Sequence, residues 1–294
     1  MNGRNANETT RAYLDSLMVT PSYLDSCVPS LETELFGKRF ASPVTICAFS
    51  HLGKQHPGGM AEMARGAALA GICNFAGMGD NAELGEILAT GAETIKIVKP
   101  YADRQKMADR IAFAEAHGAL AVGVDIDHSF GHAGYPDVVL GEEMKPLSTA
   151  ELTDLVQSTK LPFVVKGVLS VQDAVKCASA GVQGLVISHH HGIVPYAVPP
   201  LMILPEIKRA VGDRMTLIVD CGMETGSDAF KALALGAQAV CIGRAVLPAF
   251  QKDGAEGVKA FVDGMNDELR AMLAWTCSPD PAHISPNVIT YGRS

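Results

Sequence analysis

The feature that most constrains the fold is a regular alternation of short apolar runs with longer alanine-rich segments. The runs are rich in β-branched residues and cover positions 43–48, 71–75, 94–98, 120–125, 163–166, 184–188, 216–220 and 238–242. They are almost continuously apolar, as strands buried on both faces are. The segments between them, such as "TAELTDLVQS" and "GSDAFKALALG", carry capping residues and end in the way helices do. Eight such units in one chain predict an α/β protein, a single-domain (β/α)8 TIM barrel.

A doubly wound open sheet is the competing architecture. Such a sheet usually has fewer strands and carries a glycine-rich turn after the first one, whereas the chain has "CAFSHLGKQHPGG" there, which is not GxGxxG. We therefore expect residues 1–40 to form an N-terminal cap segment, residues 41–275 to form the barrel and residues 276–294 to form a C-terminal tail.

Charge and composition limit the classes of partner that this protein is expected to bind. A net charge of −8 disfavours a nucleic-acid partner, which requires a basic surface. The sequence shows neither a run of eighteen apolar residues nor a secretory signal pattern, so no membrane partner is expected. Its seven cysteines have no CxxC spacing and lie mostly in apolar segments, as in a reducing compartment. We expect a cytoplasmic protein that acts on a small molecule.

Polar side chains gather where the predicted strands end. The catalytic groups of a TIM barrel lie on the loops after the C-terminal ends of its strands. The polar residues at these positions are Ser50, His51, Asn74, Lys96, Lys99, Asp125, Asp127, His128, Lys166, Ser188, His189, His190, His191, Asp220 and Arg244. Lys166 follows "FVV", and a buried lysine requires an anion or a polar cofactor. A structural ion pair with Asp125 or Asp220 is the simpler explanation for it.

The last two units suggest a phosphate site. TIM barrels bind phosphate at the turns after strands seven and eight, through backbone N–H groups and a helix N-terminus. Gly222, Gly243 and Arg244 occupy these turns and are the candidate phosphate contacts.

Two longer segments carry a family resemblance. The segments "VVKGVLSVQDAVKCASAGVQGLVISHHHG" and "VDCGMETGSDAFKALALGAQAVCIGR" resemble the FMN-dependent α-hydroxy-acid oxidising family, which includes glycolate oxidase and lactate oxidase. The "KALALGA" and "IGR" motifs are identical to the family pattern, and "His-Pro-x-Gly" at residues 56–59 matches as well. The resemblance covers roughly residues 35–250. Related FMN barrels, such as type 2 isopentenyl diphosphate isomerases, share the phosphate end but not the histidine motif.

The resemblance implies FMN as cofactor and gives each matching residue a role. Lys166 would lie at the N1/O2 edge of the flavin, Asp220 at the ribityl chain, and Gly222, Gly243 and Arg244 at the phosphate. The other residues expected at the cofactor are Ala48, Phe49, Ser50, Gly77, Ser188 and Glu224.

The same resemblance places the chemistry on the histidine motif. His190 would be the general base, Asp125 would orient its imidazole, and Lys166 would complete the catalytic set; a one-residue shift would make His191 the base instead. The expected reaction is oxidation of a small hydroxy acid or related hydroxyl compound, with hydrogen passing to flavin N5. The residues expected to bind substrate are His189, His191, Lys99 and His128. The family also implies a homo-oligomer, a tetramer.

One family residue is missing. The arginine that binds the substrate carboxylate in the family is replaced by Ile193. A bidentate arginine contributes several kcal/mol, roughly, to the binding of a small carboxylate. Either Lys54, Lys96 or Lys99 therefore supplies the charge, or the substrate has no α-carboxylate.

The histidine cluster leaves other functions open. His128 and His132, with Asp125 or Asp127, could bind zinc or iron in a metal-dependent lyase or hydrolase. Consecutive residues at a strand end point in opposing directions, so at most two of the three histidines can meet one ion, and we predict no metal. A non-redox or reductive FMN enzyme of the isomerase type, and a flavin-binding protein without catalysis, are the remaining alternatives.

Overall fold

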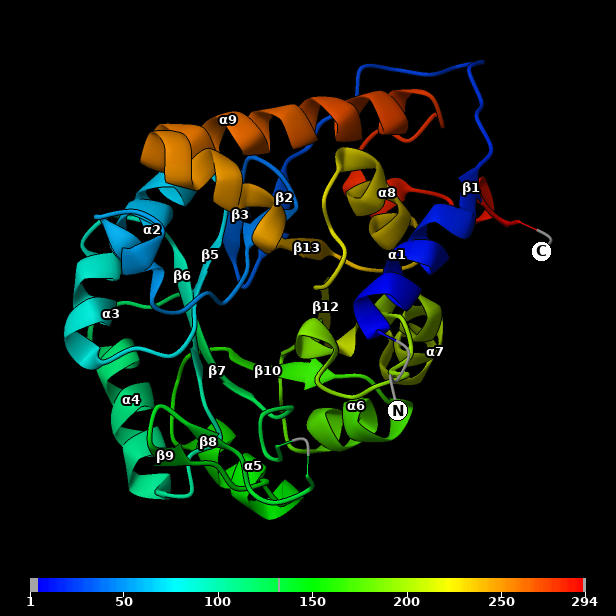
Figure 1. The fold of residues 1–294 in the computed structure, drawn as a ribbon. Coiled ribbons are helices and arrows are strands. Elements are labelled where there is room, and N and C mark those ends of the chain that lie inside the picture. The colour runs from blue at the N-terminus through cyan, green and yellow to red at the C-terminus, as the bar shows by residue number, and fades with distance from the viewer. Residues whose placement is uncertain (1–4, 132, 293–294) are drawn as a thin grey trace.

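Eight parallel strands close into a barrel in the computed structural model, which describes residues 5–131 and 133–292 (Figure 1). The barrel strands are β4 (Val44–Ile46), β5 (Asn74–Ala76), β6 (Thr94–Val98), β7 (Ala121–Asp125), β10 (Phe163–Val168), β11 (Gly184–Ile187), β12 (Thr216–Val219) and β13 (Ala239–Ile242). Each strand pairs with its neighbour in chain order, and β13 pairs with β4. Parallel bridges from Thr45 to Cys73 and from Phe49 to Ala76 close the ring between β4 and β5. The predicted (β/α)8 barrel is therefore confirmed.

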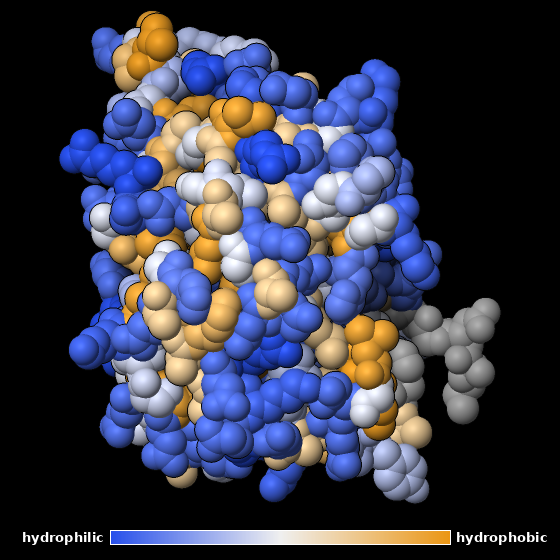
Figure 2. All heavy atoms as spheres, turned by 90° about the vertical axis from the view of Figure 1, so that its left-hand side faces the viewer, coloured by the Kyte–Doolittle hydropathy of each residue, from blue (hydrophilic) through white to orange (hydrophobic). Residues whose placement is uncertain are grey.

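Helices surround this barrel (Figure 1). They are α2 (Gly59–Ala70), α3 (Asn81–Leu88), α4 (Arg104–Ala116), α5 (Thr149–Gln157), α6 (Val171–Ser179), α7 (Pro200–Val211), α8 (Gly226–Ala234) and α9 (Leu247–Ala274). Several begin at side-chain caps: Asp103 accepts from Lys106 N–H at the start of α4, and Ser148 forms a capping box with Glu151 at α5. Figure 2 shows one side of this helical layer, where hydrophilic side chains predominate and apolar ones form small groups. No helix in residues 5–131 and 133–292 has both the length and the apolar character needed to cross a bilayer.

The barrel interior is closed at one end. The strands β2 (Thr33–Leu35) and β3 (Lys38–Phe40) form an antiparallel hairpin. Its Leu35 and Phe40 belong to the same buried cluster as Phe75, Val164 and other interior side chains of the barrel. Because this hairpin fills the N-terminal mouth, a ligand can enter the barrel from the opposite mouth, where the strands end.

The N-terminal helix lies against that opposite mouth. Helix α1 (Ala6–Ser16) is fixed there by Arg11, whose guanidinium donates to both carboxylate oxygens of Asp228 at 2.8 and 3.0 Å. Thr10 Oγ1 lies 2.9 Å from His189 Nε2. The chain then forms β1 (Leu17–Val19), which pairs with β14 (Ile289–Tyr291), so the two terminal segments lie side by side.

The second strand begins later than the sequence suggested. It was expected over residues 71–75 but begins at Asn74, because Gly71 is the C-cap of α2. The long helix α9 starts at Leu247 and contains a break with non-helical backbone at Asp253 and Gly254. The remaining elements are short: β8 (Val138–Val139), β9 (Glu142–Glu143), and the 3-10 turns η1 (Leu52–Lys54), η2 (His190–Gly192), η3 (Gly212–Arg214), η4 (Arg244–Val246), η5 (Pro281–His283) and η6 (Pro286–Val288).

Candidate active site

A cavity of about 290 Å³ opens at the C-terminal mouth of the barrel. Most of the residues expected at the cofactor line it: Ala48, Phe49, Ser50, Gly77, Lys166, Asp220, Gly222, Glu224, Gly243 and Arg244. Lys99, Asp125, His190 and His191 line it as well. Ser188, the remaining residue expected there, lies just below, with its hydroxyl 3.5 Å from Lys166 Nζ and 3.4 Å from Asp220.

Strand register sets the centre of the cavity. In the parallel ladder between β7 and β10, Lys166 is paired with Asp125, so an ammonium and a carboxylate leave adjacent strands at the same level. Lys166 is 5% exposed, and its Nζ lies 3.8 Å from Asp220 Oδ2. Burial favours the neutral amine, but the carboxylates of Asp125, Asp127 and Asp220 outweigh it, and the pKa of Lys166 is raised. Lys166 is therefore a buried permanent cation in the cavity wall.

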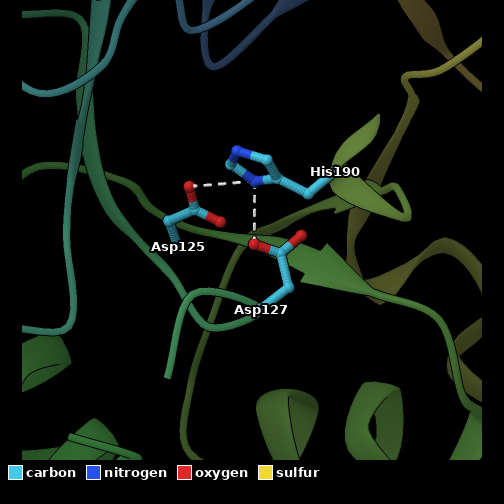
Figure 3. A group of neighbouring side chains, drawn as sticks. All are labelled: Asp125, Asp127 and His190. Carbon is cyan, nitrogen blue, oxygen red and sulfur yellow. Dashed lines mark hydrogen bonds and ion pairs between the residues drawn. The ribbon is translucent and has the colours of Figure 1, made fainter. Parts of the chain in front are cut away.

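His190 lies beside Lys166 in the wall of this cavity, in the turn η2 that follows β11, and its Nδ1 is 3.3 Å from Lys166 Nζ. Its backbone is left-handed, with φ at 44°, an uncommon conformation for a residue with a side chain. Its Nδ1 lies 2.8 Å from Asp127 Oδ1 and 3.4 Å from Asp125 Oδ2 (Figure 3). Burial and Lys166 oppose the charged imidazole, but the two carboxylates prevail, and the pKa of His190 is raised. His190 thus has the orienting carboxylate that a general base requires.

The carboxylate nearest to His190 is Asp127, whereas the sequence pointed to Asp125. Asp125 instead accepts a 2.7 Å hydrogen bond from Lys99 Nζ. Its pKa lies well below the usual range because Lys166 and Lys99 overcome the effect of burial. Burial and the neighbouring Asp125 charge raise the pKa of Asp127 to about 6. Asp125 Oδ1 and Asp127 Oδ2 are buried without a hydrogen-bond partner among the described residues, so both can still accept a hydrogen bond.

The other histidines have separate places. His128 Nε2 lies 2.8 Å from His190 Nε2, and His128 Nδ1 lies 2.9 Å from Asp137 Oδ2. His191 lines the cavity with a pKa lowered to about 4 by burial and by Arg244. His189, which the sequence assigned to the substrate, is buried against Thr10 and accepts from Gly192 N–H, and it does not line this cavity. The reason is geometric, since consecutive residues leave the end of a strand in different directions. His132 lies outside the described residues.

The far end of the cavity carries the two glycine turns. Arg244 is exposed there, and the nearest atom to a methyl group placed on Gly243 would be Cys47 Sγ at 3.6 Å. Gly222 has φ at 79° and packs against Leu14 of α1, which leaves no room for a side chain. The Glu224 carboxylate stands at the same end.

Sequence reasoning missed three parts of this site. Asp127 follows the same strand as Asp125 and stood among the polar strand-end residues, so the strand pattern located it without indicating its role. Asp137 lies in the loop after β7, where periodicity gives no signal. Asn7 lines the cavity from α1, a helix far away in the sequence.

The chain matches the model of the FMN-dependent dehydrogenase family over residues 2–146 and 132–291. The chain belongs to this family, and its cofactor is FMN. Its relatives include the L-lactate oxidase of Lactobacillus jensenii, 27% identical over 91% of this chain and 73% of that protein. The 4-hydroxymandelate oxidase of Amycolatopsis orientalis is 28% identical over 88% of this chain and 83% of that protein.

Solved structures of mandelate oxidase have the same fold. A tyrosine-to-phenylalanine variant carrying a monooxide FMN adduct superposes with a TM-score of 0.89 at 28% identity, over 98% of this chain and 93% of that one. An arginine-to-leucine variant in complex with 2-hydroxy-phenylacetamide gives a TM-score of 0.90 at 27% identity, over 99% and 92% of the two chains. This chain is therefore an oxidoreductase of the FMN-dependent type that acts on CH–OH groups.

The residues of the cavity fit FMN. A methyl group on Gly77 would lie 2.6 Å from both Ala48 O and Ser50 Oγ, so glycine allows the segments after β4 and β5 to pack closely in the cavity wall. The buried Lys166 supplies a cation, and Arg244 supplies a second one at the turn after β13. Glu224 opposes a phosphate at this end of the cavity, whereas the neighbouring Asp220 is paired with Lys166.

A metal ion fits the side chains of this site less well than FMN does. Asp125, Asp127 and His190 each offer an atom within 4.8 Å of the others. However, Lys99 donates to Asp125, and Lys166 Nζ lies 3.3 Å from His190 Nδ1. A divalent cation would stand next to two ammonium groups, which already neutralise the carboxylates.

Proposed function

We propose that the protein oxidises a hydroxyl compound with His190 as the general base. The observation that carries this proposal is the 2.8 Å contact between His190 Nδ1 and Asp127 Oδ1 at the wall of the cofactor cavity. A carboxylate on Nδ1 fixes the ring and stabilises the imidazolium that forms when Nε2 takes the hydroxyl proton. FMN, when bound, accepts the carbon-bound hydrogen with its electron pair at N5.

Lys166 and Asp220 would hold and polarise the cofactor. Lys166 is buried and permanently charged, so it stabilises negative charge at the nearby ring edge. Backbone N–H groups around Gly222 and Gly243, with the Arg244 guanidinium, would bind the phosphate.

The substrate of this reaction carries an uncharged group where the family's substrates carry a carboxylate. Ile193 replaces the arginine of the family pattern and lines a second, largely apolar cavity of about 670 Å³, together with Phe130, Leu147 and Val194. Asp127 lies in the wall of this cavity too. Of the alternative cations, Lys99 donates to Asp125, and Lys96 is buried and donates to Gly77 O. Lys54 is exposed and lines neither of these two cavities. The hydroxy amide bound to the arginine-to-leucine variant of mandelate oxidase is a compound of this kind.

Anaerobic bleaching of the flavin absorption tests the proposal. Protein reconstituted with FMN is mixed with 2-hydroxy acids, their amides and methyl esters, and simple alcohols, in wild type and in His190→Ala. We expect bleaching by one or more hydroxyl compounds in the wild type and strongly reduced bleaching in the variant. A flavin that stays oxidised with every compound would favour the isomerase-like alternative. A His190→Ala variant as fast as the wild type would disprove the role of the base.

A further inference from the structure

The contacts of His190 continue beyond its orienting carboxylate. His190 Nε2, the nitrogen that would take a substrate proton, lies 2.8 Å from His128 Nε2, and the two rings meet edge to face with centroids 4.1 Å apart. His128 Nδ1 in turn lies 2.9 Å from Asp137 Oδ2. Asp127, His190, His128 and Asp137 therefore form one row, which runs from the buried cavity wall to a carboxylate whose side chain is 25% exposed.

The hydrogen bonds of this row determine how many hydrogens the two imidazole rings carry. Each outer nitrogen, Nδ1 of His190 and Nδ1 of His128, faces a carboxylate and must carry a hydrogen. The short contact between the two Nε2 atoms needs one further hydrogen between them. The two rings thus hold three hydrogens on four nitrogens, one ring being an imidazolium and the other neutral.

The surrounding charges decide which ring is charged. His190 faces Asp125 and Asp127, as well as Lys166, and its pKa is raised. Burial, Lys99 and the neighbouring His190 lower the pKa of His128, although Asp137 and Asp125 act in the other direction. The extra proton consequently resides on His190, and His128 accepts it in a hydrogen bond.

In this resting state, His190 cannot act as a base. His190 Nε2 already carries a hydrogen, and His128 occupies the position at hydrogen-bond distance that a substrate hydroxyl oxygen would need. The proton and the His128 ring must both leave before His190 can act.

We propose that His128, backed by Asp137, is a removable proton acceptor that takes the resting proton from His190 and carries it to solvent. This inference rests on the proposed function of His190. The hydrogen passes from His190 Nε2 to His128 Nε2, and the His128 imidazolium remains paired with Asp137. Rotation of the His128 side chain then releases the proton to water and vacates the place for the substrate hydroxyl. His190 takes the hydroxyl proton, and neutral His128 returns after product release. One proton enters from the substrate and one leaves to water in each turnover, so the row regains its three hydrogens.

Histidine titration by NMR tests the coupling without any substrate. The ring signals of protein carrying 15N-labelled histidine, with FMN bound and without it, are followed against pH and assigned with His128→Gln and His190→Gln. We expect Asp137→Asn to lower the pKa of His128 and also that of His190, which Asp137 does not touch, and Asp137→Glu to restore both. Asp280→Asn is the matched control, because Asp280 Oδ1 lies 2.7 Å from His283 Nδ1 in an exposed pair in the C-terminal tail. A His190 titration that is identical in Asp137→Asn and wild type would overturn the proposal.

Chemical rescue tests the proton transfer itself. With a compound that bleaches the flavin of the wild type, we expect flavin reduction in His128→Ala to be slower by about tenfold or more and to recover as free imidazole is added. A His128→Ala variant that reduces its flavin at the wild-type rate without imidazole would overturn the proposal. A slower rate that imidazole does not restore would also overturn it, because that result indicates a structural role for His128. If no compound reduces the wild-type flavin, the proposed function fails and the NMR titration still decides the coupling of the two histidines.

Discussion

The two ends of the barrel mouth differ in how their charged groups are used. At the end formed by β12 and β13, the cation Arg244 faces the cavity, and its contact with Asn7 is a long one at 3.4 Å. At the end formed by β6, β7 and β11, Lys99 is tied to Asp125, and the carboxylate of Asp127 is tied to His190. The first end can still bind an anion, whereas the second has neutralised its own charges. The comparison teaches that the two ends of one barrel mouth can differ in charge, with a cation open to an anion at one end and paired charges at the other.

The largest expected effect separates turnover from cofactor binding. His190→Ala should slow flavin reduction by about 10²–10⁴-fold, because the variant loses the proposed general base. Its FMN content should stay at the wild-type level, since His190 lies at the end of the mouth proposed for the substrate. Anaerobic stopped-flow spectra give the rate, and the absorbance ratio of flavin to protein gives the content. Loss of FMN from this variant would show that His190 is also needed to bind the cofactor, and would contradict the assignment of separate roles to the two ends.

Lys166 lies near charged groups of both ends of the barrel mouth, Asp220 at one and Asp125 and Asp127 at the other. Its replacement should therefore lower the free energy of unfolding. Lys166→Met removes one of the two ammonium groups that compensate Asp125, leaving Lys99, and removes the ammonium that compensates the buried Asp127. Removing one partner of a buried charge network lowers the free energy of unfolding by about 3–5 kcal/mol. Urea unfolding of the FMN-free protein measures this loss. A stability equal to that of the wild type would show that the carboxylates simply take up protons instead.

Arg244 should affect the cofactor alone. Arg244→Ala removes a charge-assisted contact worth about 1.5–3 kcal/mol, which weakens FMN binding roughly tenfold to a hundredfold. Glu224→Gln is the matched change of opposite sign, and it should strengthen FMN binding because it removes the carboxylate at the phosphate end. Fluorescence titration with FMN measures both affinities. Unchanged affinity in Arg244→Ala would place the phosphate elsewhere.

The smallest expected effect is a shift in the pH dependence of kcat/KM. The proposed base His190 can accept a proton only when it is neutral, and its pKa is raised, so kcat/KM should fall as the pH drops through a value above 6.5, the ordinary imidazole value. Asp127→Asn removes a carboxylate that raises this pKa, and the acid limb should move to lower pH. Profiles of kcat/KM against pH for wild type and variant measure the shift. An acid limb that stays in place would mean that Asp125, and not Asp127, sets the pKa of His190.

The fold followed from the sequence because eight apolar runs with helical segments between them have few other ways to be buried. The second strand was misplaced, since the apolar run 71–75 begins on the residue that caps α2. Residues at strand ends, such as Lys166 and Asp220, could be located because parallel strands bring their ends to one mouth.

Loop and long-range contacts were beyond the sequence pattern. The pairing of His128 with Asp137 depends on the path of the loop after β7. The position of α1 at the mouth depends on the contact of Arg11 with Asp228, 217 residues away in the chain.

The most direct test of the central claim compares mandelic acid with 2-hydroxy-phenylacetamide as reductants of the FMN-loaded protein under anaerobic conditions. The two compounds share the hydroxyl-bearing carbon and the phenyl ring, and differ in whether the group beside them is charged. We predict a yellow protein whose flavin is bleached at a lower concentration by the amide than by the acid. Bleaching at a lower concentration by the acid, or a protein that binds no FMN, would contradict the account.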